Sequence, residues 1–322
     1  MNRELVISLL GQDWTDFQAI ARDALRTDID LLNATNETVL SNSGKQLRPM
    51  LSLLTARACG RLCDDTLHYA ATSELLHNAT LMHDDVVDES KLRRGKPTVA
   101  ALLGAGPAVL VGDFWLSRAV RLILGTAHEK EATRLYADVL SDLAEGEMLQ
   151  LQKASQADTT EEDYLRIIYC KTASLFKTTC VAAALSADAS QAYTYAVERY
   201  ATATGMAFQI RDDIFDYIDG TATGKPAGLD LMEGKITLPL LGALRNAPDA
   251  QALREKVLQI PDHPEYCAEL HEYVLAHGGV EYASGRLDDF IREATDALEA
   301  LPDSREREVL ADIARYNAIR KS

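Results

Sequence analysis

The segment His83-Asp84-Asp85-Val86-Val87-Asp88 decides how the rest of this sequence is interpreted. It reads D-D-x-x-D, and the same pattern returns at Asp212-Asp213-Ile214-Phe215-Asp216. Both copies lie in apolar, helix-like sequence, where the first and last aspartates stand one turn apart on one face. Carboxylates stacked in this way repel each other and need a cation. Oxygen ligands favour Mg²⁺ or Ca²⁺ over Zn²⁺, and a substrate phosphate usually completes a Mg²⁺ site. We therefore expect two acidic helix faces that hold one diphosphate through metal ions.

Periodicity and composition predict an all-α protein. The 322 residues are 47% hydrophobic and 25% charged, as in ordinary globular chains. Strand patterns are nearly absent and helical periodicity dominates. No stretch is long or biased enough to be a linker, so a single domain over residues 1–322 is expected. The longest expected helices cover 12–40, 65–90, 128–154, 161–186 and 189–219. Thr159 with Glu162 is expected to form a capping box for the helix over 161–186.

Charge and cysteine content narrow the functional class. The net charge of −16 argues against nucleic acid or an anionic membrane as the main partner. The longest apolar run, 99–112, is broken by Gly and Pro and is too short to span a bilayer. The five cysteines are odd in number and contain no C-x-x-C pair, which favours free thiols in a reducing compartment. With no signal peptide at the N-terminus, the cytoplasm is the expected location.

Basic and imidazole groups accompany the first motif. Lys45 and Arg48 flank the start of an apolar helix, where they form either an anion site or merely solvated charge. His77 lies two turns before Asp84 on the same face. It is a phosphate ligand, a core histidine, or, with Glu74, half of a di-iron motif whose second half is missing.

The segment that follows the first motif is strongly basic. Arg93 and Arg94 stand close to three aspartates, and guanidinium groups match phosphate geometry. Cations also stabilise a helix C-terminus, so part of this charge is explained by capping.

Further candidates surround the second motif. Lys171, followed by Thr172, lies in apolar helical sequence and must meet an anion, either a structural carboxylate or a ligand. Gln209, three residues before Asp212, is by itself only a polar residue near a helix turn. Lys225 and Lys235 belong to Gly-Lys pairs in a Gly-rich loop that could cover phosphates, although the loop is not a Walker motif.

Two small residues precede the first motif. Ala79 and Thr80 are five and four positions before Asp84 on the helix. Small side chains there either allow close helix packing or open the throat of a tunnel that leads away from the diphosphate.

Together these segments resemble the trans-polyprenyl (isoprenyl) diphosphate synthases, of the medium- or long-chain type. The resemblance runs from about Gly44 to Pro239. Each motif is weak alone, but all of them occur in order: G-K-x-x-R-P at 44–49, both aspartate motifs, R-R-G-x-P-T at 93–98, Lys171-Thr172, Gln209, G-K-x-x-G-x-D-L at 224–231 and G-K-x-T-L-P at 234–239.

The resemblance implies a large helical bundle around a central cavity, the isoprenoid synthase type, and usually a homodimer. It implies head-to-tail joining of isopentenyl diphosphate to an allylic diphosphate, for which farnesyl diphosphate is the expected primer. Mg²⁺, with more than one ion per site, is the implied cofactor. The family assigns the final proton transfer to the departing diphosphate, so no protein nucleophile is needed.

By position, the family's roles transfer to the following residues. Asp84, Asp88, Asp212 and Lys171 would be catalytic, and the metal ligands would be Asp84, Asp88, Asp212 and Asp216, supported by Asp85 and Asp213. Isopentenyl diphosphate would be bound by Lys45, Arg48, His77 and Arg94. The allylic diphosphate would be bound by Arg93, Lys171, Thr172, Gln209, Lys225 and Lys235.

Product length depends in this family on what blocks the cavity. Short-chain members carry bulky aromatic residues just before the first aspartate motif, whereas this chain has Ala79 and Thr80. A product longer than C20 is therefore expected, with Tyr136 or Leu140 as the floor. The alternative is a short-chain farnesyl or geranylgeranyl diphosphate synthase.

Three other classes compete with this interpretation. A His-Asp metal phosphohydrolase would explain His83-Asp84, but it needs several clustered histidines and the others are scattered. A terpene cyclase shares the aspartate motif but has no use for an isopentenyl site. A purely structural bundle leaves the repelling aspartates and Lys171 unexplained.

Overall fold

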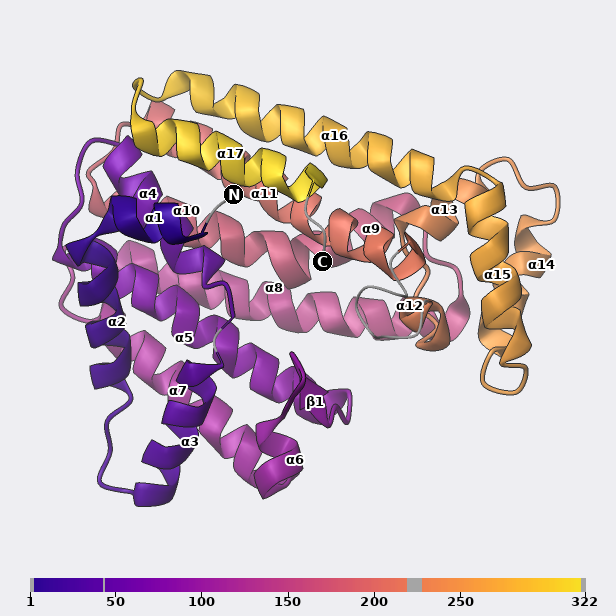
Figure 1. Ribbon diagram of the computed structural model, residues 1–322, viewed down its shortest axis with the longest axis horizontal. Helices are drawn as coiled ribbons and strands as arrows, with labels where there is room; N and C mark the ends of the chain where they lie inside the picture. The colour runs from indigo at the N-terminus through magenta and orange to yellow at the C-terminus, as the bar shows by residue number, and fades with distance from the viewer. Residues whose placement is uncertain (1–2, 43, 219–227, 320–322) are drawn as a thin grey trace. The chain divides into compact units, whose positions relative to one another are not determined.

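The computed structural model describes residues 3–42, 44–218 and 228–319, and these are almost entirely helical (Figure 1). The prediction of an all-α protein is confirmed. The helices of the amino-terminal part are α1 (Arg3–Leu10), α2 (Gln12–Ala24), α3 (Asp30–Ser41), α4 (Leu47–Ala58), α5 (Asp64–Val87), α6 (Val99–Leu103) and α7 (Ala105–Ile123).

The remaining helices follow without a strand between them in the described residues. They are α8 (Glu129–Gln156), α9 (Glu161–Ile168), the π-helical segment η1 (Tyr169–Ala173), α10 (Ser174–Ser186), α11 (Gln191–Ile218), α12 (Leu229–Met232), α13 (Leu238–Leu244), α14 (Ala250–Gln259), α15 (Glu265–Ala276), α16 (Gly279–Ala297), the 3₁₀ turn η2 (Leu298–Ala300) and α17 (Arg305–Ile319). None of the helices in the described ranges combines the length and the hydropathy that a bilayer crossing requires.

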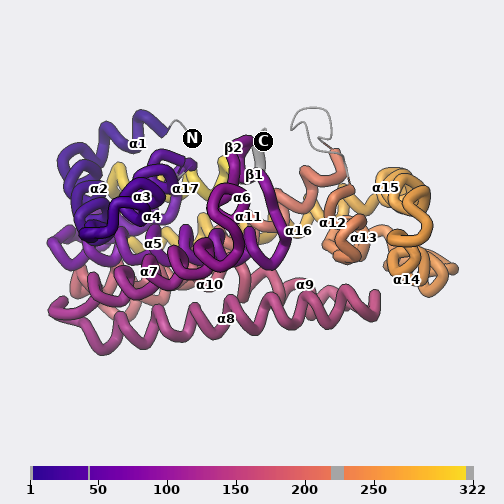
Figure 2. The backbone as a smooth tube through the Cα atoms, turned by 90° about the horizontal axis from the view of Figure 1, so that it is seen from below, coloured from indigo at the N-terminus to yellow at the C-terminus, as the bar shows by residue number. Residues whose placement is uncertain are grey.

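A small β-hairpin interrupts the helices directly after the first aspartate motif. Strands β1 (Leu92–Arg93) and β2 (Lys96–Pro97) pair antiparallel, and both views show them beside α6 (Figure 2). Arg94 and Gly95 form the two-residue turn, and both have positive φ, at 53° and 74°. A turn with two positive φ values matches the twist of the paired strands. The sequence predicted only a loop here.

The contacts divide the chain into two compact units. The first holds residues 1–136, 178–197 and 300–310, and the second holds 137–177, 198–299 and 311–322. The dividing points fall inside α8, α10, α11, η2 and α17, so each unit is built from segments distant in sequence. The single domain over 1–322 stays a prediction.

Helix α5 is the core element of the first unit. It contacts α2, α4 and α7, and most of its side chains are buried around its whole circumference. A helix that is apolar on all sides is stable only when it is surrounded. Tyr69 and Leu75 are fully buried on α5, and Trp115 of α7 is fully buried with its indole N–H donated to Asn36 at 2.8 Å.

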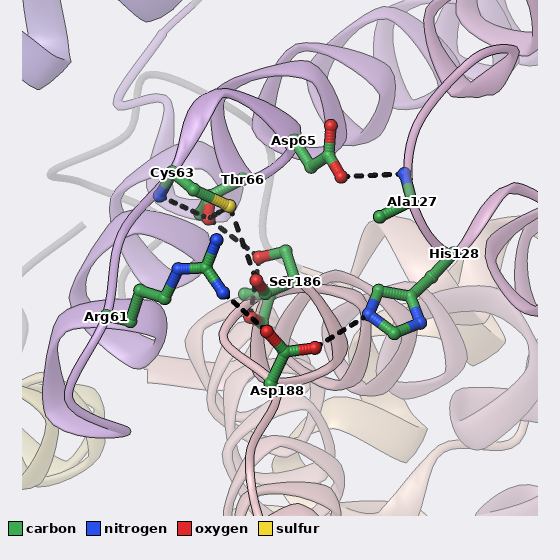
Figure 3. A network of polar contacts seen from close by, with 9 residues as sticks. Arg61, Cys63, Asp65, Thr66, Ala127, His128, Ser186 and Asp188 are labelled. Carbon is green, nitrogen blue, oxygen red and sulfur yellow. Dashed lines mark hydrogen bonds and ion pairs between the residues drawn. The ribbon is translucent and has the colours of Figure 1, made fainter.

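Three connections at one end of this unit are tied together by polar contacts (Figure 3). Arg61 and His128 both contact the Asp188 carboxylate, at 2.5 and 3.0 Å. Asp65 accepts the Ala127 N–H at 2.8 Å, which fixes the connection between α7 and α8 to the start of α5. Asp188 has φ of 53°, a conformation that a carboxylate-bearing residue tolerates better than most.

The second unit has its own core. Side chains from α9, α11, α13 and α16 meet there, among them the fully buried Ile210, Ile214 and Leu240. Helices α13 and α16 pack so closely that a Cβ on Gly242 would lie 2.7 Å from the Tyr282 side chain. The glycine at 242 is therefore required by packing.

Two helix boundaries differ from those expected. The predicted helix over 12–40 is broken after Ala24, because Asn33 exchanges side-chain hydrogen bonds with the backbone of Thr27. The capping box of α9 is formed by Thr160 and Asp163, and the prediction of Thr159 with Glu162 is wrong by one residue. The Thr159 side chain is buried instead.

Candidate active site

The first aspartate motif lies at the carboxyl end of α5. Asp84 and Asp85 belong to its last turn, and Asp88 is the residue that follows its final helical position. The Asp88 N–H donates to the Asp84 carbonyl at 2.8 Å, so the two residues keep helical spacing. A helix C-terminus carries partial negative charge, so carboxylates there are unfavourable and a nearby cation offsets their charge. The helix end thus gives a second reason for a cation.

The middle aspartate of this motif has a structural partner. Asp85 is buried, and its Oδ1 lies 2.8 Å from both Nε and Nη2 of Arg93 on β1. Burial raises the pKa of Asp85, and the Arg93 guanidinium opposes that rise. Arg93, predicted to bind the allylic diphosphate, therefore holds the hairpin to α5, and Asp85 supports the motif from inside.

A group of basic side chains surrounds His77 in the first unit. Burial is the main cause that lowers the pKa of His77 well below its usual value, and the charges of Arg48, Arg94 and Arg93 lower it further. The imidazole is thus neutral at pH 7 and offers a hydrogen bond, not a charge. Burial also lowers the pKa of Arg48 to about 10. Predicted isopentenyl ligands Arg48, His77 and Arg94 are therefore neighbours.

The Arg94 side chain lies against the segment that carries Lys45. Arg94 Nη1 donates to the Asn42 carbonyl at 2.9 Å. A Cβ on Gly44 would lie 2.3 Å from the same guanidinium, so only glycine allows this approach. Lys45 is exposed at this point, and its carbonyl accepts a bond from Arg3 at 3.3 Å.

Glu74 is the buried acid of this group. Burial raises its pKa to about 7, opposed by the Asn78 side chain and by the charges of Arg48 and Arg94. The folded state therefore binds the Glu74 proton more tightly than the unfolded state. This stabilisation is complete below the ordinary value of 4.5 and is lost as the pH rises through about 7.

We expect Glu74→Gln to remove this pH dependence. The free energy of unfolding of the native protein, relative to the variant, should fall by at most roughly 3 kcal/mol between about pH 5 and about pH 8. Chemical denaturation at the two pH values measures it. If the free energies of unfolding of the native protein and the variant differ by the same amount at both pH values, Glu74 is not the group responsible.

The predicted chain-length residues lie along the same helix. Ala79 is fully buried, and Thr80 is half-buried with its hydroxyl bonded to the His77 carbonyl at 2.9 Å. The hydroxyl of Tyr136, at the start of α8, lies 2.8 Å from Ser73 Oγ on α5. Ser73 is eleven positions before Asp84, about 16 Å along the helix. Tyr136 thus meets α5 three turns from the aspartate motif.

The second aspartate motif lies in the last two turns of α11. Asp212 is half-buried, whereas Asp213 is buried and accepts bonds from Tyr164 at 2.6 Å and from Gln209 at 2.8 Å. Burial raises the pKa of Asp213 to about 6. Gln209 also accepts the Thr172 hydroxyl at 2.8 Å. The structure therefore links two predicted allylic ligands, Thr172 and Gln209, to the supporting aspartate.

Asp216 is engaged with the chain that follows the motif. Its two carboxylate oxygens accept the backbone N–H groups of Leu229 and Asp230, each at 3.0 Å, and so cap the short helix α12. Each oxygen keeps a further lone pair for a cation. Lys235 is paired with Glu233. The predicted ligand Lys225 lies outside the described residues.

Lys171 lies in the π-helical segment η1. Its ammonium group is 2.5 Å from Glu147 Oε2 and donates to Gln150 Oε1 at 3.1 Å, both on α8. Of the two anions left open by the sequence, the described residues supply the structural carboxylate. Single π turns occur often at functional sites. This one is closely packed, since a Cβ on Gly205 of α11 would lie 2.6 Å from Ala173 Cα.

The ligand chemistry fits a hard divalent cation. Asp84 and Asp88 in one unit, and Asp212 and Asp216 in the other, offer only carboxylate oxygens. Among the described residues, no three acidic, histidine or cysteine side chains gather into a complete metal cage. Incomplete protein coordination is usual for Mg²⁺, because phosphate oxygens and water fill its remaining positions.

Two carboxylate faces that suit Mg²⁺, together with adjoining guanidinium groups, have the chemistry to hold a diphosphate. The polyprenyl synthetase family model matches residues 29–274 of this chain. The chain is 37% identical over 316 residues to an octaprenyl diphosphate synthase of Escherichia coli strain K12, covering 98% of both chains. It therefore belongs to the polyprenyl synthetase family and is a trans-prenyltransferase.

Two further comparisons support membership of this family. The chain is 37% identical over 312 residues to a geranyl-diphosphate-specific all-trans-nonaprenyl-diphosphate synthase of Rhodobacter capsulatus, covering 96% and 95% of the two chains. The crystal structure of a polyprenyl synthase from Caulobacter crescentus CB15, complexed with calcium and isoprenyl diphosphate, matches with a TM-score of 0.90 and 33% identity, covering 100% and 98%. The isoprenoid synthase fold expected from the motifs is confirmed, and the phosphohydrolase and structural-bundle alternatives are set aside.

Sequence reasoning missed the groups that hold the site residues in place. Tyr164 holds Asp213, and Glu147 holds Lys171. The only signal for Glu147 was the buried lysine itself, which demands a counter-charge. Tyr164 gave no signal, because a tyrosine seven residues before Lys171 looks like any apolar helix position.

Proposed function

We propose that this prenyltransferase joins isopentenyl diphosphate head-to-tail to an allylic diphosphate, such as farnesyl diphosphate, and makes an all-trans polyprenyl diphosphate longer than C20. The observation that carries the long product is the pair Ala79 and Thr80, which places small side chains on α5 at the fifth and fourth positions before Asp84. The 37% identity to an octaprenyl diphosphate synthase over nearly the whole chain supports the same conclusion.

The metal ligands in this proposal are the outer aspartates of the motifs: Asp84, Asp88, Asp212 and Asp216. Mg²⁺ bound there would supply positive charge to the leaving diphosphate as the allylic bond breaks. The chain positions the carboxylates for this purpose at helix ends. The Arg93 pair holds Asp85, and the bonds from Tyr164 and Gln209 hold Asp213.

The isopentenyl diphosphate is proposed to bind to the basic group of the first unit. Arg48 and Arg94 supply charge, neutral His77 supplies a hydrogen bond, and Lys45 lies on the exposed side. Burial is the main cause that lowers the pKa of Arg48, and the charge of Arg94 lowers it further. A bound diphosphate would offset both effects on the half-buried Arg48 guanidinium.

The allylic diphosphate is proposed to bind to Arg93, Lys171, Thr172, Gln209, Lys225 and Lys235. Three of these cations have carboxylate partners in the structure: Arg93 contacts Asp85, Lys171 contacts Glu147 and Lys235 contacts Glu233. A bound diphosphate must either displace these carboxylates from the cations or share the cations with them. A shared lysine still contributes charge to the leaving group, because its ammonium carries three donors.

The growing chain is proposed to run along α5 from Asp84 towards Tyr136. Ser73, Tyr136 and Thr179 form a hydrogen-bonded group, with bonds of 2.8 and 2.9 Å. Polar groups that satisfy each other in this way resist displacement by a hydrocarbon tail. We propose that Tyr136 is the floor on which elongation stops.

A homodimer is proposed on the basis of an apolar surface. Helix α7 exposes Val109, Leu110 and Val120, and Leu102 and Leu124 flank it with more than half of their surfaces open. Exposed apolar residues at helical spacing mark a docking face, and a second copy of the chain presents the same face. Light scattering should give twice the chain mass of 35.3 kDa, and a monomeric mass would contradict this.

The cytoplasm is the proposed location. All five cysteines, three of them half-buried and two buried, are free thiols in the structure. Free thiols persist in a reducing compartment.

Product sizing tests the proposed function. The chain is incubated with isopentenyl diphosphate, farnesyl diphosphate and Mg²⁺, and the products are separated by reversed-phase chromatography. We expect products longer than C20 and none when Mg²⁺ is chelated. Products that stop at C20, one isopentenyl unit beyond the farnesyl primer, would instead support the short-chain alternative, and a cyclised product would support the terpene cyclase.

A further inference from the structure

A chain of hydrogen bonds links three elements of the second unit and ends at Tyr164 on α9. The Tyr164 hydroxyl lies 2.6 Å from Asp213 Oδ2, and the Gln209 amide nitrogen lies 2.8 Å from Asp213 Oδ1. The Thr172 hydroxyl then donates to Gln209 Oε1 at 2.8 Å. Tyr164 and Asp213 are buried, so solvent does not replace their bond.

Asp213 sets the direction of every bond in this chain. The Tyr164 hydroxyl donates to one of its oxygens, and the Gln209 amide nitrogen donates to the other. Gln209 therefore turns its NH₂ group to Asp213 and its carbonyl oxygen to Thr172. One amide N–H of Gln209 is used by Asp213, which leaves the second for a ligand oxygen.

The orientation of Gln209 thus depends on a carboxylate that Tyr164 holds from its other side. We propose that Tyr164 is a positioning residue for the allylic substrate, which it serves by fixing Asp213 and, through Asp213, the orientation of Gln209 and Thr172. This inference rests on the proposed function, in which Gln209 and Thr172 bind the allylic diphosphate. Tyr164 is buried and does not need to touch the substrate.

The conservative variant Tyr164→Phe tests this role. It removes one hydroxyl and keeps the ring in the core. We expect the KM for farnesyl diphosphate to rise about tenfold, as for loss of a hydrogen bond to a charged group. The KM for isopentenyl diphosphate should change less than about twofold, because its proposed ligands lie in the other unit and none of them joins this chain.

Tyr282→Phe is a matched control. The Tyr282 hydroxyl donates to Glu161 Oε2 at 2.6 Å, and Glu161 lies on α9, the same helix as Tyr164. The two variants therefore remove the same type of bond, of the same length, from one helix. Glu161 is outside the aspartate motifs and keeps a bond from Arg286. We expect Tyr282→Phe to lower Tm slightly and to leave both KM values unchanged.

The outcomes separate this proposal from the proposed function. If Tyr164→Phe lowers Tm but has the same KM for each substrate as Tyr282→Phe, Tyr164 is merely structural and the proposal is overturned. If the native chain forms no prenyl product, the proposed function fails. The two variants are then compared by their calorimetric Kd for farnesyl diphosphate, which should be about tenfold higher for Tyr164→Phe alone if Tyr164 positions this ligand. If Tyr164→Phe does not fold, Asp213→Asn breaks the same chain and should raise the same KM about tenfold.

Discussion

Asp84→Ala should lower kcat by roughly three orders of magnitude or more. Asp84 is proposed as a metal ligand, and its loss removes positive charge from the departing diphosphate at the moment that negative charge develops there. The helical fold should be retained, because Asp84 lies in the last turn of α5 and alanine is a good helix former.

Asp64→Ala provides the matched control for this prediction. Asp64 is exposed in the first turn of the same helix, where a carboxylate is favourable to the dipole. This variant should keep full activity and lose about 0.3–1 kcal/mol of stability. Rates of product formation and thermal melts of both variants check the prediction. An active Asp84→Ala protein would show that this carboxylate is not a required ligand.

Ala79→Tyr should shorten the product from more than C20 to C20 or less. The phenol ring would project from α5 five residues before Asp84, about 7.5 Å along the helix. One turn of helix is comparable in length to one isoprene unit, so the ring would stop elongation early. Chromatography of the products measures the change. Ala79→Ser adds almost no volume and should keep the long product.

This substitution also decides between the two interpretations of the small residue. Ala79 is fully buried. If it only allows α5 to pack against its neighbours, a tyrosine there would overpack the core, lower stability by about 1–3 kcal/mol and leave the length of the remaining product unchanged. If it borders the channel, the fold should tolerate the ring while the product shortens.

The elements that sequence predicted well are those with strong local signals. The periodicity of residues 65–90 identified α5, because apolar residues recur at helical spacing along its whole length. The aspartate motifs were placed on helices for the same reason. The break between α2 and α3 was missed, since it depends on one asparagine that bonds to Thr27 six residues away.

The groups that hold the site residues could not be predicted, because their partners are distant in sequence. The bond between Tyr164 and Asp213 spans 49 positions, and the bond between Thr172 and Gln209 spans 37. Sequence reasoning showed that buried Lys171 must meet an anion but not that Glu147 provides it. Such pairs are fixed by tertiary packing, which local patterns do not encode.

Calorimetric titration of Mg²⁺ in the presence of inorganic pyrophosphate tests most directly whether the two aspartate faces hold divalent cations against a diphosphate. The native chain should bind Mg²⁺ with pyrophosphate present and much more weakly without it, and Asp84→Ala and Asp212→Ala should each abolish the enhancement. Equal Mg²⁺ binding by the native chain and both variants would contradict the account.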